Sequence, residues 1–275
     1  DHISSMYGKP LSSFDNEELI MHTITILPGH DRHGNPETFE ALHLRPGDTL
    51  AIVGPTGSGK SAFINDIEVF AQGDTATGRR ILLDGETPPE RFVRDPACKP
   101  IALITQTTKC LADLTVSEFL GMHLRARKIT EGNLIEKTIQ LTNEFTGEPI
   151  RPECRISSLS GGQTRSLLIA DAVIISNAPI ILLDEVENAG IFRDRVITCL
   201  KKSGTSVIFV THDPLVSLMS DRRIVMGNGA VKAVLEPDGS EESVLKHVTE
   251  IDLYLSSLRE RLRSGEVLRE TVAAA

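Results

Sequence analysis

The sequence predicts an α/β fold with a mostly parallel sheet, an N-terminal antiparallel β subdomain and an inserted helical subdomain. Three observations support this prediction. Runs of consecutive apolar residues at 50–53 and 180–183 are typical of strands buried on both faces of a parallel sheet. Segments with helical patterns follow these runs. Between residues 115 and 178 no strand-like run occurs, which indicates a helical insertion.

The first part of the chain is predicted to be rich in strands. Alternating apolar and polar residues predict the first strand at 19–27. A loop follows at 28–36, because Gly, Pro, Asp and His dominate there. The elements expected after this loop are strands at 38–44 and 50–53, a helix at 61–70, and strands at 80–85 and 100–105.

The helical insertion begins with a capping box. Thr115 and Glu118 stand three positions apart, as the two members of such a box do, and place a helix start at Thr115. A second helix is expected at 131–145, and a third follows residue 163 and runs to about Val173. These helices form the predicted helical subdomain, at about 107–178.

The C-terminal part returns to alternating strands and helices. Asp213-Pro214 is a good N-cap and first residue for a short helix that ends near Leu218. A Gly-Asn-Gly turn predicts a β-hairpin. The elements expected here are strands at 180–183 and 206–210, a short helix at 192–202, hairpin strands at 223–226 and 230–235, and a charged helix from 240 to about 268.

Composition restricts the function. With 275 residues and 40% hydrophobic residues the chain can bury a substantial core. A net charge of −9 and only 4% aromatic residues argue against a nucleic-acid-binding surface. The four cysteines, Cys98, Cys110, Cys154 and Cys199, lack the close spacing of a zinc site. No segment reaches the roughly 18 apolar residues of a membrane helix, so we expect a soluble, cytoplasmic protein. Residues 1–18 are taken as an N-terminal extension or an expression remnant.

A glycine-rich motif between the strand at 50–53 and the following helix carries the clearest chemistry. It matches the pattern G-x-x-x-x-G-K-[ST], in which backbone N–H groups and the helix N-terminus surround phosphate oxygens. The lysine supplies a charge to the β- and γ-phosphates, and the last hydroxyl binds Mg²⁺. The motif consists of Gly54, Pro55, Thr56, Gly57, Ser58, Gly59, Lys60 and Ser61. It predicts a P-loop NTPase core but leaves kinase, GTPase and ATPase open.

A second motif narrows the choice. Leu159-Ser160-Gly161-Gly162-Gln163 precedes a helix, and a pentapeptide of this kind occurs by chance in on the order of one chain in a few thousand. It resembles the signature motif of the ATP-binding cassette (ABC) ATPases, and residues 54–61 resemble their Walker A loop. The resemblance extends over residues 20–236. It implies an ATPase domain at 19–236 and a C-terminal helical extension at 237–275.

Other residues are similar to further elements of the family. Asp184 and Glu185 follow an apolar strand, as in Walker B, which implies that Asp184 binds Mg²⁺ and Glu185 polarises the attacking water. Gln106 matches the Q-loop glutamine, which would reach the metal and the nucleotide. His212 matches the switch histidine at the γ-phosphate. The catalytic residues implied are thus Glu185, His212 and Lys60, and the metal ligands are Ser61, Gln106 and Asp184.

The resemblance also implies a partner. ABC ATPases dimerise head to tail, with ATP between Walker A of one copy and the signature of the other. Ser160, Gly161, Gly162 and Gln163 would therefore bind the nucleotide of a second copy or of a paralogous cassette. ATP binding closes such a dimer, and hydrolysis opens it.

The chain departs from the family pattern in four places, one of which is a separation of Glu185 and His212 about one helical turn shorter than is typical. The family usually has Ser-Ala-Leu-Asp after Walker B, whereas residues 188–191 are Asn-Ala-Gly-Ile, so Ile191 replaces the acid. Residues 164–166 are Thr-Arg-Ser instead of Gln-Gln-Arg. The aromatic residue that stacks on adenine is missing before Walker A. His30 and His33 are the candidates for this role, and Phe39 and Tyr7 are weaker ones.

Three functions follow from these observations. The favoured hypothesis is the ATPase subunit of a transporter whose membrane-spanning domains are separate chains, which would hold it at the inner face of the membrane. The alternative is a soluble ABC ATPase that remodels or assembles proteins. A role on nucleic acid is disfavoured by the acidic charge. The amphipathic segment at 250–268 is expected to pack on its own domain, with dimerisation or partner docking as the other hypothesis.

Overall fold

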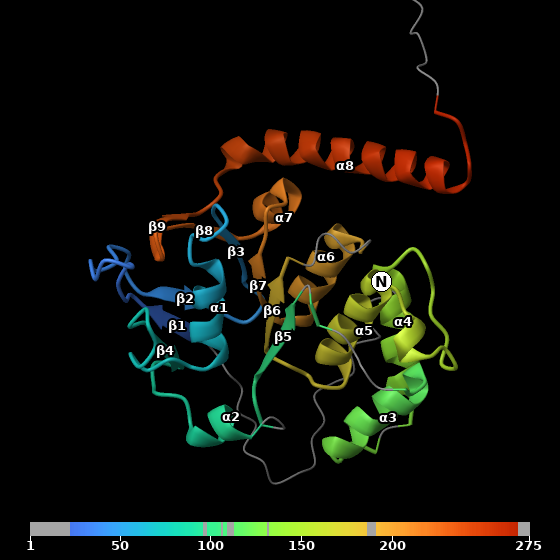
Figure 1. The fold of residues 1–275 in the computed structure, drawn as a ribbon, viewed down its shortest axis with the longest axis horizontal. Coiled ribbons are helices and arrows are strands. Elements are labelled where there is room, and N and C mark those ends of the chain that lie inside the picture. Colours follow the sequence, from blue (N-terminus) through green and yellow to red (C-terminus); the bar gives the residue numbers. More distant parts are fainter. Residues whose placement is uncertain are drawn as a thin grey trace, which may run out of the picture.

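A parallel sheet, a smaller antiparallel sheet and a group of helices build the structure, a computed structural model (Figure 1). It describes residues 23–95, 98–105, 107–108, 113–130, 132–185 and 191–268, without the side chain of residue 260. The first and last residues of the chain and five short internal stretches lie outside this description. The predicted α/β fold class, with its antiparallel β subdomain and helical insertion, is confirmed.

The main sheet has the strand order β5-β6-β7-β3-β8-β9, and only β9 is antiparallel to its neighbour. Its central strands are almost completely buried, which explains their continuous apolar runs. The strands are β3 (Thr49–Val53), β5 (Ile101–Thr105), β6 (Ile180–Asp184), β7 (Ser206–Val210), β8 (Arg222–Gly227) and β9 (Ala230–Leu235). The predicted hairpin is formed by β8 and β9.

The smaller sheet has the order β2-β1-β4, and both pairings are antiparallel. Its strands are β1 (Ile24–Leu27), β2 (Leu42–Leu44) and β4 (Arg80–Leu83). Strand β2 is shorter than the predicted strand at 38–44. The chain before it is not paired with β1, and Glu37, just ahead of this stretch, forms an ion pair with a buried arginine, Arg79.

The helices confirm the local capping signals. Thr115 forms the capping box with Glu118, and the Asp213 carboxylate accepts hydrogen bonds from two backbone N–H groups at the start of the next helix. The helix Glu90–Arg94 (α2) was not predicted, because five residues carry too little periodicity. The other helices are α1 (Lys60–Glu68), α3 (Val116–Ala126), α4 (Leu134–Phe145), α5 (Gly161–Ile174), α6 (Arg193–Ser203), α7 (Pro214–Met219) and α8 (Glu242–Arg263).

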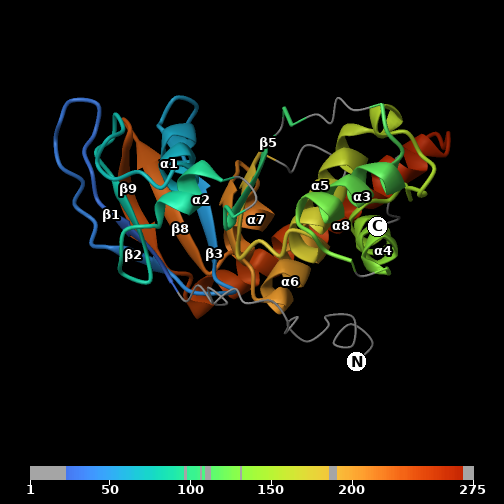
Figure 2. The ribbon, with the colours of Figure 1, turned by 90° about the horizontal axis from the view of Figure 1, so that it is seen from below.

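The core consists of three apolar clusters. One lies between the small sheet, α1 and one face of the main sheet, and a second between the other face, α5 and α6. The third is built largely from α3, α4 and α5, and gives the helical insertion a core of its own. Figures 1 and 2 both show β5 between α1 on one side and α5 on the other. The phosphate-binding loop and the second glycine motif are therefore carried by different parts of the molecule.

A buried arginine joins the small sheet to the main one. The Arg79 side chain is inaccessible to solvent and forms ion pairs with Glu37 at 2.5 Å and with Asp66 of α1 at 3.0 Å. Its guanidinium also donates to the Gly229 carbonyl at 3.0 Å and lies over the Phe63 ring. Because a buried charge is costly unless it is fully paired, these contacts hold the loop at 29–37, helix α1 and the β8–β9 turn in one arrangement.

Candidate nucleotide site

The glycine-rich loop joins the end of β3 to the start of α1, and two of its glycines cannot be replaced without strain. Gly54 has φ 150° and Gly59 has φ 106°, which lie in the region that favours glycine. A Cβ atom on Gly54 would lie 2.5 Å from the Met226 carbonyl oxygen, and one on Gly59 would lie 2.8 Å from Gly229 Cα. The β8–β9 hairpin therefore packs directly against the loop at both glycines.

Lys60 is buried at the first position of α1. Its Nζ donates to the carbonyl oxygens of Gly54 at 2.7 Å and Pro55 at 3.1 Å. The backbone of the loop thus surrounds the ammonium group of Lys60. The neighbouring Ser58 hydroxyl is also buried, and it has no hydrogen-bond partner among the described residues. A buried polar group of this kind is available to a ligand.

A cavity of about 410 Å³ opens above this loop. It combines residues of the loop and of α1 with residues at the carboxyl ends of β6 and β7, where ligands bind in open α/β sheets. Its lining consists of Arg32, Thr56, Gly57, Gly59, Lys60, Ser61, Ala62, Asp184, Glu185 and Val210. The structure therefore brings together the predicted groups Lys60, Ser61, Asp184 and Glu185.

Glu185 has an unusual backbone conformation. Its φ is 50°, a left-handed value that is uncommon outside glycine and is often found where strain serves function. Its N–H donates to the Val210 carbonyl at 2.9 Å, which fixes the turn at the end of β6. In this conformation Glu185 Oε1 lies 3.4 Å from Nε2 of His212, and both side chains remain partly accessible to solvent.

Asp213, the residue after His212 in the chain, is fixed by several contacts. The Asp213 carboxylate caps α7 and also forms an ion pair with Arg193, the first residue of α6. The second arm of the Arg193 guanidinium reaches Asp252 in α8. The backbone next to His212 is thereby connected to two helices outside the cavity.

The second glycine motif forms the start of α5. The Ser160 hydroxyl accepts a hydrogen bond from the Gln163 N–H at 3.2 Å, and the Gln163 side chain accepts one from the Ser160 N–H at 2.8 Å. Gln163 also donates to the Glu148 carbonyl. Burial lowers the pKa of the Arg165 guanidinium on the next turn. None of these residues lines the cavity over the phosphate loop.

Comparison with known proteins identifies the family. A family model described as ABC transporter matches residues 40–188, more than half of the chain. The chain belongs to the ABC transporter family. An uncharacterized ABC transporter ATP-binding protein of Methanocaldococcus jannaschii is 46% identical over 245 residues, which cover 89% of this chain and 94% of that protein. The domain described above is thus an ABC ATPase domain.

More distant relatives agree with this assignment. A spermidine/putrescine import ATP-binding protein of Photobacterium profundum is 28% identical over 83% of this chain, and the match spans 63% of that protein. The structure of CbiO1 from Clostridium perfringens, part of an ABC transporter complex, matches with a TM-score of 0.60 at 21% identity. That match covers 87% of this chain and 99% of CbiO1, and it shows the fold.

Two predicted ABC elements lie partly or wholly outside the described residues. Gln106 directly follows β5 but is not described, and the same holds for residues 186–190 after Walker B. Ile191, which replaces the acid usual in the family, is buried and forms an isolated bridge with Thr146. An apolar residue is suited to this position, because it packs into the cluster between α4 and α6.

Arg32 is the cavity residue that sequence reasoning missed. Its guanidinium donates to the Gly57 carbonyl of the phosphate loop, and its N–H donates to the Asn228 carbonyl. It is the only basic side chain other than histidine in the loop at 28–36, and this is the sequence signal that could have identified it. Neither His30 nor His33, the two predicted candidates, lines the cavity. His30 instead lies against Gly78.

Asp31 fixes the loop that carries Arg32. Its carboxylate accepts hydrogen bonds from the Asn35 side chain and from the N–H groups of Asn35 and His33. These hydrogen bonds, those of Asn35 above all, lower the pKa of Asp31 to about 2. Asp31 therefore stays ionised, and holds the loop, throughout the neutral and mildly acidic range.

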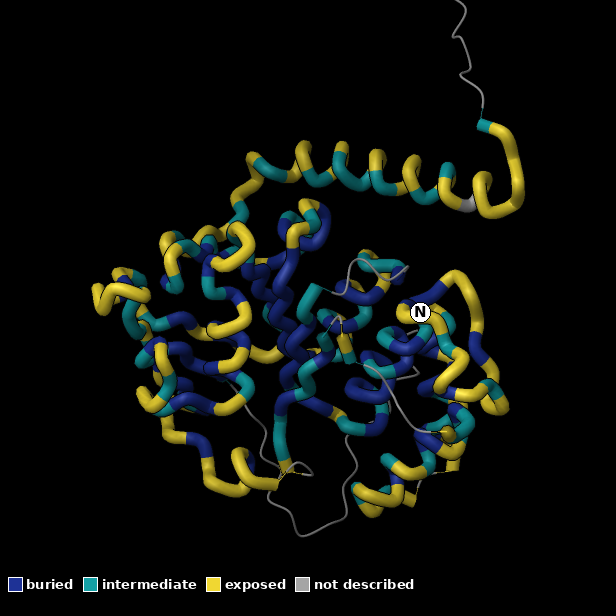
Figure 3. Tube along the Cα trace, in the orientation of Figure 1, coloured by how far each residue is buried: buried dark blue, intermediate teal, exposed yellow. Residues whose placement is uncertain are grey.

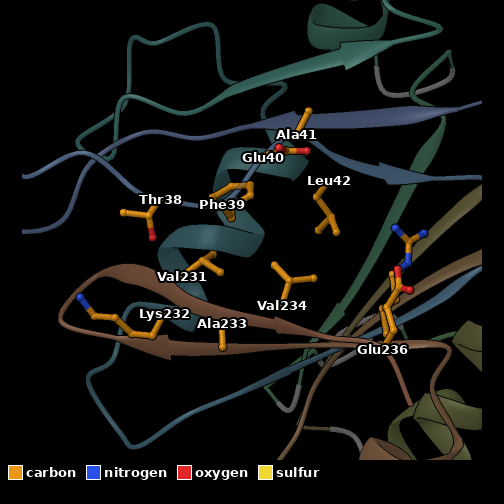
Figure 4. Close-up of a pocket in the computed structure, with 11 residues that line it drawn as sticks. Thr38, Phe39, Glu40, Ala41, Leu42, Val231, Lys232, Ala233, Val234 and Glu236 are labelled. Carbon is orange, nitrogen blue, oxygen red and sulfur yellow. The ribbon is translucent and has the colours of Figure 1, made fainter. Parts of the chain in front are cut away.

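Phe39 belongs to a different hollow. Phe39 belongs to the segment before β2. Its side chain lines this hollow together with Val231 and Val234 of strand β9, as Figure 4 shows. This hollow has a volume of about 340 Å³ and shares no residue with the cavity above the phosphate loop. Phe39 is therefore not placed to stack on a nucleotide at that loop. Tyr7, the other weak candidate, lies outside the described residues.

Proposed function

We propose that this chain binds and hydrolyses ATP as a head-to-tail dimer and uses the closure of that dimer to drive work on a partner. The observation that carries the proposal is the separation of the two glycine motifs. Residues of the Walker A loop and Glu185 line one cavity, and His212 lies 3.4 Å from Glu185, whereas Ser160 starts a helix of the helical subdomain and does not line the cavity. A second copy supplies the missing signature.

The roles of the cavity residues follow from their chemistry. Lys60 exchanges the carbonyls of Gly54 and Pro55 for β- and γ-phosphate oxygens, while the loop N–H groups and the N-terminus of α1 surround the phosphates. Glu185 orients and polarises the attacking water, and His212 contacts the γ-phosphate. Arg32 stacks on the base, which gives the nucleotide the planar contact that an aromatic residue provides elsewhere in the family.

The residues present also fit Mg²⁺. This cation prefers oxygen ligands and is usually held by one or two protein groups together with substrate phosphates and water. Ser61 and Asp184 offer one hydroxyl and one carboxylate at the same cavity, and Gln106 is the third proposed ligand. When bound, the ion neutralises charge on the β- and γ-phosphates. No cluster of three or more His, Cys, Asp or Glu suited to a metal occurs in the described part of the chain.

The partner site uses the capped start of α5. The hydrogen bonds between Ser160 and Gln163 hold the N-terminus of this helix open toward solvent, with Gly161 exposed beside it. An uncovered helix N-terminus with small residues suits an anion that approaches from another molecule. Ser160, Gly161, Gly162 and Gln163 therefore bind the γ-phosphate of the nucleotide on the partner.

Transport through separate membrane-spanning subunits is the work that we favour. The named relatives are ATP-binding proteins of transporters, which supports this choice. The chain would then act at the cytoplasmic face of the membrane. Within the described residues, no helix has the length and apolar character needed to cross a bilayer. The alternative is a soluble ATPase that remodels or assembles proteins, and the atypical Ile191 and the long C-terminal helix favour it.

A single variant tests the proposal and its alternative. Glu185→Gln should bind ATP, hydrolyse it slowly and show an ATP-dependent increase in mass in size-exclusion chromatography, from head-to-tail pairing. Partners captured by this variant from cells should be membrane proteins with several spanning helices if the chain serves transport. Capture of soluble proteins alone would support the remodelling alternative. A variant whose mass does not increase on addition of ATP, although it binds the nucleotide, would refute the head-to-tail dimer.

A further inference from the structure

The last helix, α8, carries an apolar seam with the spacing of a coiled coil. Its apolar residues alternate at intervals of four and three positions along the helix. This 3.5-residue period is the mark of helices that pack side by side, with apolar residues at the a and d positions. The seam consists of Val244, Val248, Ile251, Leu255, Leu258 and Leu262.

The seam is not covered by the rest of the described structure. Val244 is 49% exposed, Ile251 58%, Leu255 43% and Leu262 58%, and the other two members are only partly buried. In Figure 3, α8 shows only intermediate and exposed residues, whereas the strands beneath it are buried. The helix packs on its own domain, as predicted, through contacts with α7 and the ion pair of Asp252 with Arg193, but most of its apolar side chains are not part of that packing.

The helix is nevertheless fixed to its own domain, by a different side. Asp252 forms an ion pair with Arg193 of α6, and Thr249 and Ser256 next to it are partly buried. These residues lie about a quarter turn from the seam, given 3.6 residues per turn. Figures 1 and 3 show α8 as the outermost element on its side of the molecule. A second helix can therefore lie along the seam without displacing α8.

We propose that the seam packs against α8 of a second copy of this chain, in a parallel two-stranded coiled coil that forms without nucleotide. In this arrangement each seam residue meets its own counterpart, so six apolar layers are buried. The inference is independent of the proposed ATP-driven dimer, because none of the seam residues belongs to the nucleotide cavity or the signature motif.

The polar side chains that flank the seam favour a second copy in the parallel orientation. Parallel pairing places His247 next to the partner's Asp252, and Tyr254 next to the partner's Arg259, so each flanking pair is favourable. Antiparallel pairing would instead place Asp252 next to the partner's Asp252, and His247 next to the partner's Arg261. The ion pair of Asp252 with Arg193, which attaches α8 to its own domain, is also compatible with the parallel orientation. In a parallel pair the two ATPase domains lie on opposite sides of the helices, whereas in an antiparallel pair they would lie on the same side.

The test measures the mass of the full chain in solution without nucleotide, by light scattering over the micromolar range. The parent chain should be a dimer, and Ile251→Glu and Leu255→Glu should each convert it to a monomer. Leu253→Glu is the matched control, because Leu253 is 64% exposed but lies on the opposite side of the helix from the seam. That variant should remain dimeric. Circular dichroism and ATP binding should be the same for all three variants.

Two results would overturn the proposal: a monomeric parent chain across this range, or equal loss of the dimer in Leu253→Glu and the seam variants. A crosslink tests the orientation. Ile251→Cys should form an intermolecular disulfide beyond any seen for the parent, whereas Leu253→Cys should not, and a dimer without the first crosslink would refute parallel pairing. The seam variants should still form the ATP-dependent dimer in the Glu185→Gln background. Failure of that dimer would count against the proposed function and leave the nucleotide-free dimer intact.

Discussion

The imidazole Nε2 of His212 lies 3.4 Å from the carboxylate Oε1 of Glu185, at the edge of the cavity above the phosphate loop. The pair depends on the meeting of two strand ends. Glu185 follows β6 and His212 follows β7, and the N–H of Glu185 donates to the last carbonyl of β7, that of Val210. A base and a histidine so placed can contact the attacking water molecule and the γ-phosphate at the same time.

Removing the charge of Glu185 should block hydrolysis but preserve binding. Glu185→Gln keeps the shape of the side chain and its neighbourhood to His212 but cannot polarise water. We expect kcat to fall by roughly 10²- to 10⁴-fold, the usual contribution of a general base, while the Kd for ATP changes little. Phosphate release and equilibrium ATP binding measure the two quantities. A variant that turns over at the parental rate would remove Glu185 from the mechanism.

Loss of the Lys60 ammonium should weaken nucleotide binding itself. In Lys60→Ala the phosphates lose a charge-assisted interaction at the centre of the loop, and the carbonyls of Gly54 and Pro55 lose their donor. We expect the Kd for ATP to rise roughly ten- to a hundredfold, as for other hydrogen bonds to charged groups. Lys99→Ala, which removes a surface ion pair with Glu68, is the control and should leave the Kd unchanged. Equal affinity in both variants would contradict the site.

Arg32 should contribute to ATP affinity through its planar guanidinium. Arg32→Ala should raise the Kd for ATP by about three- to thirtyfold, the range that corresponds to a cation–π contact. Arg32→Lys should restore little of this loss, because an ammonium cannot stack in the same way. His33→Ala on the same loop is the control and should bind ATP as the parent does. Full recovery with lysine would show that charge, and not stacking, is the contribution of Arg32.

The buried ion pair between Arg79 and Glu37 should be essential for stability. Glu37→Gln leaves the guanidinium without its main counter-charge at a position closed to solvent, and breaking a pair of this kind costs about 3–5 kcal/mol. We therefore expect Tm to fall by roughly 10 °C in a chain of this size. Glu90→Gln breaks the exposed pair with Arg94 and should change Tm by little. Similar thermal melting curves for the two variants would contradict this role of Arg79.

Short-range features of this protein could be predicted from the sequence because their causes are local. The capping box at Thr115, the cap at Asp213 and the hairpin turn at 227–229 each involve residues a few positions apart, and all are confirmed. The phosphate loop is local in the same sense, since its glycines and lysine are neighbours in the chain. Buried strands were recognisable because complete burial requires continuous apolar residues.

Contacts between segments that are distant in the chain left no local pattern in the sequence from which they could be predicted. Arg79 meets Glu37 and Gly229 across long stretches of chain, and nothing in those residues distinguishes them from exposed ones. Arg32 reaches the phosphate loop only because the small sheet is held against the β8–β9 turn. The rings of His30 and His33 have suitable chemistry for stacking, but neither residue lines the cavity.

The C-terminal helix separates the two kinds of information most clearly. Its length, its amphipathic character and the 3.5-residue spacing of its apolar residues are properties of the sequence alone, since they depend on the order of side chains along one helix. Which side of that helix faces the domain was decided by the pairing of Asp252 with Arg193, which meets it from α6. A helical pattern states which residues share a face, but only packing against other segments determines whether that face is buried or left for a partner.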